Sequence, residues 1–285
     1  GSALCDKLKQ EHQVFGLSRH PSADVRIDLL MHQFSLPDVD FVIHTAGLAH
    51  KFTEDSTSMH QNNVLATENL LNNLDPSTLK GFIHCSTVAV YGITTGIDIN
   101  ESVSPNPIDS YGDSKYNAEQ LISNWCSKNE IPYLILRLPL VVGENAPGNI
   151  YRLMDSLKRG RFFLIKDNQS KRSLILLDDL VDLIKNKIKD GITKTGVYNL
   201  SDGIGVDFND FVFNLCEVNG YKKPIMLPFW MAKSLAILNS MLGGRIFSLS
   251  VFTKMTQTLT FSSQKANQDL QWSPNPILGT IRTVR

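Results

Sequence analysis

The 285-residue sequence predicts an α/β protein with a Rossmann-like, doubly wound parallel sheet and a smaller C-terminal part, and two observations carry this prediction. Short apolar runs that end in small or hydroxyl residues are typical of buried parallel strands, and the clearest cover 41–48, 81–87 and 133–143. Patterns with apolar residues three and four apart, which are typical of helices, alternate with these runs. Strands that alternate with helices give an open parallel sheet covered on both faces.

The elements follow in a regular order up to residue 143. Apolar runs predict strands at 12–19, 25–29, 41–48, 81–87 and 133–143, and helical spacing predicts helices near residue 4, at 62–71 and at 111–128. Beyond Gly143 the alternation gives way to a helix that opens near 147–151, a strand at 162–165, a strand at 197–202, a helix at 208–218 and apolar helices within 225–252. We expect one domain over 1–143 and a second part over 144–285, with residues 172–202 returning to the first.

The strongest chemical signal lies between residues 81 and 115. An apolar run there ends in a Ser-Thr pair, whose Thr87 stands four residues before a Tyr-Gly pair, and a helical pattern opens at Tyr111. Tyr111 and Lys115 are four residues apart and so lie on one helix face. A phenol titrates near ~10, too high for a base at neutral pH, and a nearby ammonium lowers that pKa. With Thr87 binding the same oxygen, the three residues can move a proton at a C–OH or C=O group.

On these motifs the chain resembles the extended short-chain dehydrogenase/reductase family of NAD(P)-dependent nucleotide-sugar epimerases, dehydratases and ketoreductases, and the resemblance covers nearly the whole chain. It implies that Tyr111 is the proton donor or acceptor, that Lys115 lowers its pKa and holds the ribose, and that Thr87 bonds the reacting oxygen. Substrate contacts are implied for Ser86, Thr87, Asn149 and Arg172, the last beside the diphosphate; the alternative for Arg172 is a surface charge.

The resemblance also implies a dinucleotide site in the domain over 1–143. Gly1-Ser2-Ala3-Leu4 resembles the last glycine of the family's Gly-x-x-Gly-x-x-Gly motif and the residues after it, so we expect a strand and two glycines to precede the sequence. An expression-tag scar is the alternative. Backbone N–H groups of such a loop hold the pyrophosphate. The implied cofactor contacts are Gly1, Ser18, Arg19, Asp28, Leu29, Thr45, Ala46, Gly47, Asn63, Tyr111, Lys115, Pro139 and Val141.

The end of the strand at 12–19 bears on the choice of cofactor. NAD-preferring members carry an acidic residue there for the ribose hydroxyls, whereas this chain has Ser18-Arg19-His20. A guanidinium can pair with the 2′-phosphate of NADP. We therefore expect NADP(H) to be favoured over NAD(H), and a solvated loop arginine is the alternative.

Two reactions at C4 of a nucleotide-linked hexose share this machinery. The absent acidic residue favours a 4-ketoreductase of surface polysaccharide biosynthesis, and an NAD-dependent 4-epimerase of the UDP-glucose or UDP-GlcNAc type is the alternative. The 4,6-dehydratases usually carry Asp-Glu after the catalytic Thr, whereas Val88-Ala89 stand here, so we discard dehydration. A non-catalytic NADP-sensing or scaffold protein is a remote alternative, against which the intact Thr87, Tyr111 and Lys115 argue.

Composition excludes some other classes. Charge is balanced at 28 basic against 28 acidic residues, so no nucleic-acid partner is implied. The four scattered cysteines indicate neither a metal nor disulfides, and buried free thiols suit a reducing, cytoplasmic location. We expect a UDP-sugar substrate and a homodimer. The apolar helices at 225–252 indicate core plus a dimer or lid contact, and a membrane-surface contact is the alternative.

Overall fold

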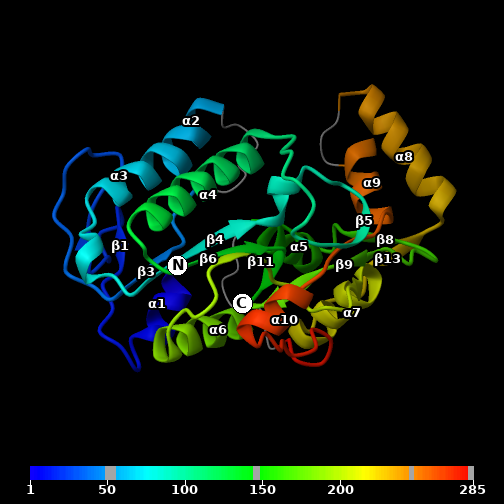
Figure 1. Cartoon of the computed structure of the whole chain (residues 1–285). Helices are drawn as coiled ribbons and strands as arrows, with labels where there is room; N and C mark the ends of the chain where they lie inside the picture. Colours follow the sequence, from blue (N-terminus) through cyan, green and yellow to red (C-terminus); the bar gives the residue numbers. More distant parts are fainter. Residues whose placement is uncertain (49–55, 144–147, 244–246, 282–285) are drawn as a thin grey trace.

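The computed structural model describes residues 1–48, 56–143, 148–243 and 247–281, and it confirms the α/β fold. Within the described residues the main sheet has four parallel strands in the order β11-β6-β4-β3 (Figure 1). These strands are β3 (Phe41–His44), β4 (Gly81–Thr87), β6 (Tyr133–Leu138) and β11 (Gly196–Asn199). The late strand β11 pairs in parallel with β6 and so forms one edge of the main sheet.

Helices cover both faces of this sheet (Figure 1). One layer holds α2 (Ser56–His60), a π-helical turn (Gln61–Leu65), α3 (Ala66–Asn72) and α4 (Ser110–Lys128). The other holds α1 (Ser2–Leu8), α6 (Leu177–Asp190) and α10 (Gln264–Leu270). On β4, Phe82 packs with the α3 and α4 cluster and Ile83 with the α1 and α6 cluster. This two-sided burial explains why the strand is a continuous apolar run.

The two early strands are shorter than the sequence predicted. Instead of 12–19 and 25–29, the structure has β1 (Leu17–Ser18) and β2 (Val25–Arg26), which pair with each other in parallel. In the described part of the chain this pair is separate from the main sheet, and each strand alternates a half-buried with an exposed residue. With a partner on one side only, fewer backbone groups are held in a ladder.

The C-terminal part surrounds a second core. The elements of this part include β7 (Leu140–Val142), α5 (Asn149–Lys158), β8 (Phe163–Ile165), β10 (Leu174–Leu176), α7 (Phe208–Asn219) and β13 (Ile225–Leu227). Beside them, β12 (Val206–Asp207), β9 (Lys171–Arg172), β14 (Leu259–Phe261) and β5 (Gly96–Ile99) form a mixed sheet in that order. The division at residue 143 stays a prediction.

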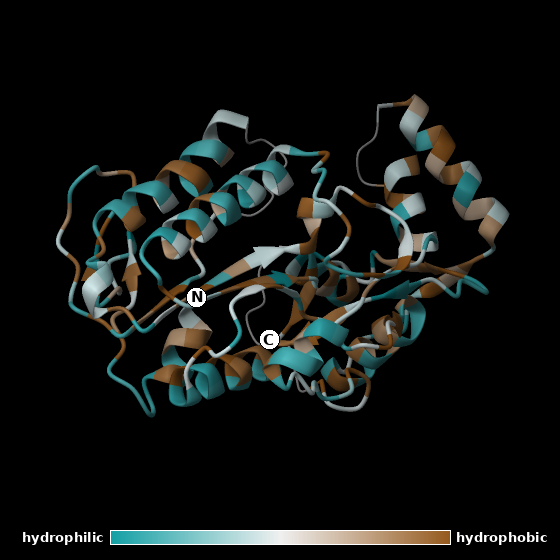
Figure 2. Ribbon diagram, in the orientation of Figure 1, coloured by the Kyte–Doolittle hydropathy of each residue, from teal (hydrophilic) through white to brown (hydrophobic). Residues whose placement is uncertain are grey.

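A helical hairpin stands at one end of the molecule (Figure 1). It consists of α8 (Phe229–Met241) and α9 (Leu249–Thr256), and it packs on β8 through Ala232, Ala236, Phe252 and Met255. Figure 2 shows apolar residues recurring along α8, which projects from the body. None of the helices in the described ranges is long and apolar enough to cross a membrane.

A turn after β4 requires glycine. Gly92 ends a 3-10 helix with φ +67°, and a Cβ there would lie 1.9 Å from the Asn106 carbonyl oxygen. Gly220 ends α7 with nearly the same φ, +66°, but a Cβ there would meet nothing within 4 Å. The two glycines therefore separate the cost of left-handed backbone from the cost of a steric clash.

We expect Gly220→Ala to lower the free energy of unfolding by about 1 kcal/mol, since it adds only backbone strain. Gly92→Ala should cost about 1–3 kcal/mol more, because the added methyl group must also displace backbone. Urea unfolding of both variants measures the difference. Equal losses would show that the loop at Asn106 yields freely.

Candidate functional site

The candidate site lies at the carboxyl edge of the main sheet. His44 at the end of β3 is paired in register with His84 on β4, and Thr87 at the end of β4 is paired with Leu138 at the end of β6. The small residues 45–47 follow β3 at the same edge. In doubly wound sheets, ligands bind outside the carboxyl ends of the strands.

The start of α4 is fixed against the end of β4, and this brings Tyr111 to Thr87. Asp109 caps α4 by accepting a hydrogen bond from the Gly112 N–H at 2.8 Å. A Cβ on Gly112 would lie 2.7 Å from the Ala89 carbonyl oxygen, so only glycine permits this approach. The Thr87 hydroxyl lies close enough to the Tyr111 phenol to lower its pKa. The structure thus brings together two residues that are 24 positions apart in sequence.

The protonation of Tyr111 follows from its surroundings. Burial raises the pKa of the Tyr111 phenol, the Thr87 hydroxyl lowers it, and the Asp109 carboxylate raises it, with burial the largest cause. The net direction is upward, so at neutral pH the side chain is a phenol that can donate a proton. To act as a base it must first be deprotonated, which a stronger positive charge nearby would favour.

Lys115 lies one turn further along α4 and is buried. Its Nζ donates to the Cys85 carbonyl oxygen at 2.9 Å, and burial lowers the pKa of Lys115 to about 8, while Cys85 and Glu119 raise it. The Cys85 carbonyl is thus an immediate partner of the ammonium. The lowering of the Tyr111 pKa by Lys115 stays a prediction.

Asn63 connects the end of β3 to α4. Its side-chain amide donates to the Leu48 carbonyl at 3.1 Å and to Ser114 Oγ at 2.8 Å, and its Oδ1 accepts from the Leu48 N–H at 2.5 Å. A Cβ on Gly47 would lie 3.1 Å from Asn63 Oδ1 and 3.8 Å from Lys115 Nζ. These contacts hold the glycine backbone beside the ammonium.

A buried ion pair beneath the site was missed by sequence reasoning. Arg137 on β6 bonds Glu119 on α4 at 2.7 Å, and Ser86 donates its hydroxyl proton to the same carboxylate. The Arg137 guanidinium also lies 4.8 Å from the centre of the Tyr91 ring. Ser86 is 4% exposed and its hydroxyl donates to Glu119, so its contact with a substrate stays a prediction. The available signal was Arg137, the one charged residue in the otherwise apolar or aromatic sequence of β6.

Two stacked histidines complete the interior under this edge. The rings of His44 and His84 lie 5.2 Å apart, and burial lowers the pKa of both, to about 3 for His44. Thr67 Oγ1 donates to the Asn63 carbonyl at 2.6 Å and lies 2.9 Å from His44 Nε2, so it accepts a hydrogen bond from the N–H of that nitrogen. Both rings are neutral packing groups.

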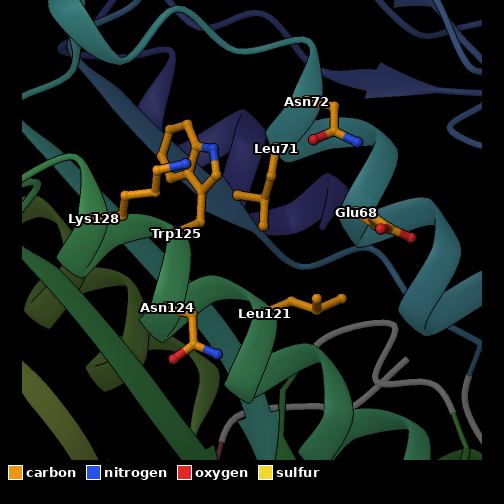
Figure 3. Close-up of a pocket in the computed structure, with 7 residues that line it drawn as sticks. All are labelled: Glu68, Leu71, Asn72, Leu121, Asn124, Trp125 and Lys128. Carbon is orange, nitrogen blue, oxygen red and sulfur yellow. The ribbon is translucent and has the colours of Figure 1, made fainter.

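A groove between α3 and α4 lies away from this edge (Figure 3). It is lined by Glu68, Leu71, Asn72, Leu121, Asn124, Trp125 and Lys128. At 1.5 Å per helical residue, its α4 residues begin about 15 Å along the helix from Tyr111. The groove is therefore distinct from the candidate site.

Comparisons with known proteins settle the family. The model of the NAD dependent epimerase/dehydratase family matches residues 1–201. The chain belongs to this family. This confirms the resemblance that the motifs indicated, and with it an enzyme whose family depends on a nicotinamide dinucleotide.

Relatives of the epimerase/dehydratase family support this result. An N-acetyl-alpha-D-glucosaminyl-diphospho-ditrans,octacis-undecaprenol 4-epimerase of Escherichia coli O157:H7 is 29% identical over 79% of this chain, which spans 66% of that relative's length. A UDP-glucose 4-epimerase of Vibrio cholerae is 29% identical over 85% of this chain and 74% of its own. A UDP-glucuronic acid 4-epimerase structure from Bacillus cereus, 22% identical, superposes with a TM-score of 0.74 over 97% of this chain and 90% of its own, which supports the fold.

The carboxyl edge fits the dinucleotide of the epimerase/dehydratase family. Gly1 stands at the start of α1, where a Cβ would lie 3.1 Å from Thr45 Oγ1, so this glycine lies directly against the end of β3. Ala46 and Gly47 are exposed beside it, and small residues let a ligand approach the backbone closely. Thr45, Ala46, Gly47 and the Lys115 ammonium would hold the cofactor.

The other predicted cofactor contacts are more dispersed. Ser18 Oγ accepts from the His20 N–H at 3.1 Å, and Asp28 Oδ1 accepts from the Leu30 N–H at 3.0 Å. Arg19 is exposed, with its guanidinium 3.4 Å from Asn62 Oδ1. Leu29, Pro139 and Val141 are half-buried, and Pro139, which has no N–H, separates β6 from β7. These roles stay predictions.

The two outlying substrate residues lie on the C-terminal part. Asn149 is the exposed first residue of α5. Arg172 on β9 donates to the Lys254 carbonyl, and burial lowers its pKa. This contact explains a structural role for Arg172, and its diphosphate role stays a prediction.

The buried Lys115 predicts a pH dependence of stability. Its pKa is lower in the folded state, about 8, than the ordinary value of 10.5, so between these values the unfolded chain binds more protons. Stability therefore rises with pH across this window. Compared with Lys115→Met, the wild type should gain roughly 3 kcal/mol between the two limits. Urea unfolding at several pH values measures this gain, and parallel curves for the two proteins would contradict it.

Proposed function

We propose that the protein carries out NAD(P)-dependent oxidation and reduction at C4 of a diphosphate-linked hexose, with 4-epimerisation as the net reaction. The single observation that carries this proposal is the closeness of the Tyr111 phenol to the Thr87 hydroxyl, one helical turn from the buried Lys115. A phenol and a hydroxyl that lie side by side can both reach one substrate oxygen. Family membership supplies the coarser statement, an epimerase/dehydratase type of enzyme.

Each residue then has a defined task. A nicotinamide dinucleotide held at this edge would supply the acceptor, and later the donor, of the C4 hydride. Tyr111 takes the proton of the C4 hydroxyl as that hydride leaves, and it gives the proton back when the hydride returns to the opposite face. Thr87 donates a hydrogen bond to the same oxygen, and Lys115 stabilises the phenolate by its charge. No proton or hydride is lost over the cycle, which is the balance that an epimerisation requires.

Relatives favour epimerisation over the other outcomes. Both the Escherichia coli and Vibrio cholerae relatives carry the name of a 4-epimerase. A dTDP-D-glucose 4,6-dehydratase of Dictyostelium discoideum is 30% identical over 64% of this chain. In this chain, however, Val88 and Ala89 follow Thr87 in a 3-10 helix and offer neither an acid nor a base to expel water. Dehydration is therefore not proposed.

Net reduction of a 4-keto sugar is the second candidate, and the residues after β1 favour it. Ser18 and Arg19 stand where a carboxylate would repel the 2′-phosphate of NADP, and the guanidinium could attract it. The exposure of Arg19 and its long contact with Asn62 favour the solvated loop arginine instead. We therefore rank the NADPH-dependent 4-ketoreductase of polysaccharide biosynthesis second.

The carrier of the sugar is a diphosphate in either case. We propose UDP, with Arg172 and Asn149 on the part of the chain that faces the substrate. A lipid diphosphate, as in the name of the Escherichia coli relative, contains the same anionic group. A homodimer remains a proposal as well.

We expect Tyr111→Phe to lower turnover by ~10²–10⁴-fold while dinucleotide affinity is retained, because only the ionisable oxygen is removed. Tyr116→Phe on the same helix is the matched control and should leave turnover unchanged. Interconversion of UDP-glucose and UDP-galactose, or of their N-acetylated forms, measures the effect. A Tyr111→Phe enzyme that kept more than about a hundredth of the wild-type rate would remove Tyr111 from the acid/base role.

The bound cofactor separates the two candidates. For an epimerase we expect NAD⁺ to survive gel filtration, and Arg19→Ala to change the dissociation constants for NADH and NADPH by less than about threefold, as for an exposed side chain. Fluorescence titration of the nicotinamide measures both constants. A clear NADPH preference that collapses in Arg19→Ala would instead support the ketoreductase.

A further inference from the structure

Exposed apolar side chains concentrate on one segment of the molecule. Of the seventeen large apolar residues that are exposed in the described chain, eleven lie between 225 and 249. They are Ile225, Met226, Phe229, Trp230, Met231, Leu235, Ile237, Leu238, Met241, Leu242 and Leu249. Such a concentration marks an interaction surface, since single apolar residues scattered over a surface need no explanation.

Helix α8 contacts the body through its smallest residues. Ala232 and Ala236, one turn apart, are fully buried, whereas Trp230 is 67% and Met241 80% exposed. At 100° per residue, Trp230, Leu238 and Met241 lie on the side of the helix opposite the two alanines. An ordinary surface helix turns its apolar side inward, so α8 is inverted. Figure 2 shows how far this helix projects from the body.

The stretch of sequence around this segment, residues 218–268, carries charge of one sign only. Residues 218–268 contain six Lys or Arg and no Asp or Glu. Because the whole chain is balanced at 28 against 28, the remainder carries 22 basic and 28 acidic residues. Lys222, Lys223, Lys233 and Lys254 are exposed, and Lys233 flanks the outward face of α8. The apolar surface is thus bordered by uncompensated positive charge.

We propose that α8 and the adjoining exposed residues of β13 and α9 dock the protein on an anionic lipid surface. Tryptophan and aliphatic side chains enter the boundary between headgroups and acyl chains, and lysines beside them pair with acidic headgroups. With 13 residues α8 extends about 20 Å, too short to span the hydrocarbon core, so it lies in the plane of the surface.

A second copy of the chain fits this surface less well. A two-fold interface brings the same patch of both subunits together, so the lysines of one copy would face those of the other. The segment contains no carboxylate to neutralise them. An anionic bilayer covers the apolar residues and neutralises the lysines together. The inference goes beyond the proposed reaction and does not depend on it.

Vesicle flotation tests the proposal with the whole protein. We expect it to float with phosphatidylcholine vesicles that contain about 30% phosphatidylglycerol, and to bind pure phosphatidylcholine at least about tenfold more weakly. Trp230→Ser combined with Leu238→Ser should reduce binding by at least about tenfold. Ile97→Ser combined with Ile204→Ser, which alters residues 75% and 79% exposed elsewhere, is the matched control and should bind as the wild type does.

Sedimentation velocity without lipid tests whether a second copy of the chain, rather than a lipid surface, covers these residues. If Trp230→Ser with Leu238→Ser turned a dimer into a monomer, a second copy would cover the face and the proposal would fall. It would also fall if the wild type failed to float, or if the double variant floated as well as the wild type. Unchanged far-UV circular dichroism and an unchanged urea midpoint of the variants show that loss of binding is not loss of fold.

Discussion

The buried pair between Glu119 and Arg137 is the constraint on which the candidate site depends. Both side chains are almost fully removed from water, and a buried charge is tolerated only when it is paired and hydrogen-bonded. Glu119 belongs to the helix that carries Tyr111 and Lys115, and Arg137 belongs to the strand beside β4. Any shift of the helix along the sheet would separate the two charges, so the pair fixes the position at which Tyr111 meets Thr87.

The pair of Glu119 and Arg137 is also connected to the C-terminal part through a chain of side-chain contacts. Arg137 lies over the Tyr91 ring, and the Tyr91 hydroxyl donates to Asn199 Oδ1 at 2.8 Å on the strand that returns to the main sheet. The amide of Asn199 donates in turn to the Ile99 carbonyl at 3.1 Å, at the end of β5. A cation–π contact and two hydrogen bonds therefore connect the ion pair beneath the candidate site to the mixed sheet that carries Arg172.

The features of the fold and of the candidate site that could be predicted from the sequence are those that depend on local sequence pattern. The apolar run before Thr87 and the spacing of Tyr111 and Lys115 are local, and both the strand and the helix formed as expected. The partners of Lys115, Ser86 and Arg172 depend on packing between distant segments, and no spacing reveals that a lysine donates to the carbonyl of Cys85. The two early strands were predicted too long for a related reason. Their apolar pattern was correct, but strand length depends on backbone pairing, which is a property of the folded sheet.

Charge segregation gives the docking surface an orientation. Outside residues 218–268 the chain is net acidic, so an anionic bilayer repels the body of the protein while it attracts the hairpin. Contact is then confined to one end, and helix α8 lies flat while the main sheet stands away from the lipid. The docking that we propose for α8 would therefore add a location to the enzyme without constraining its chemistry.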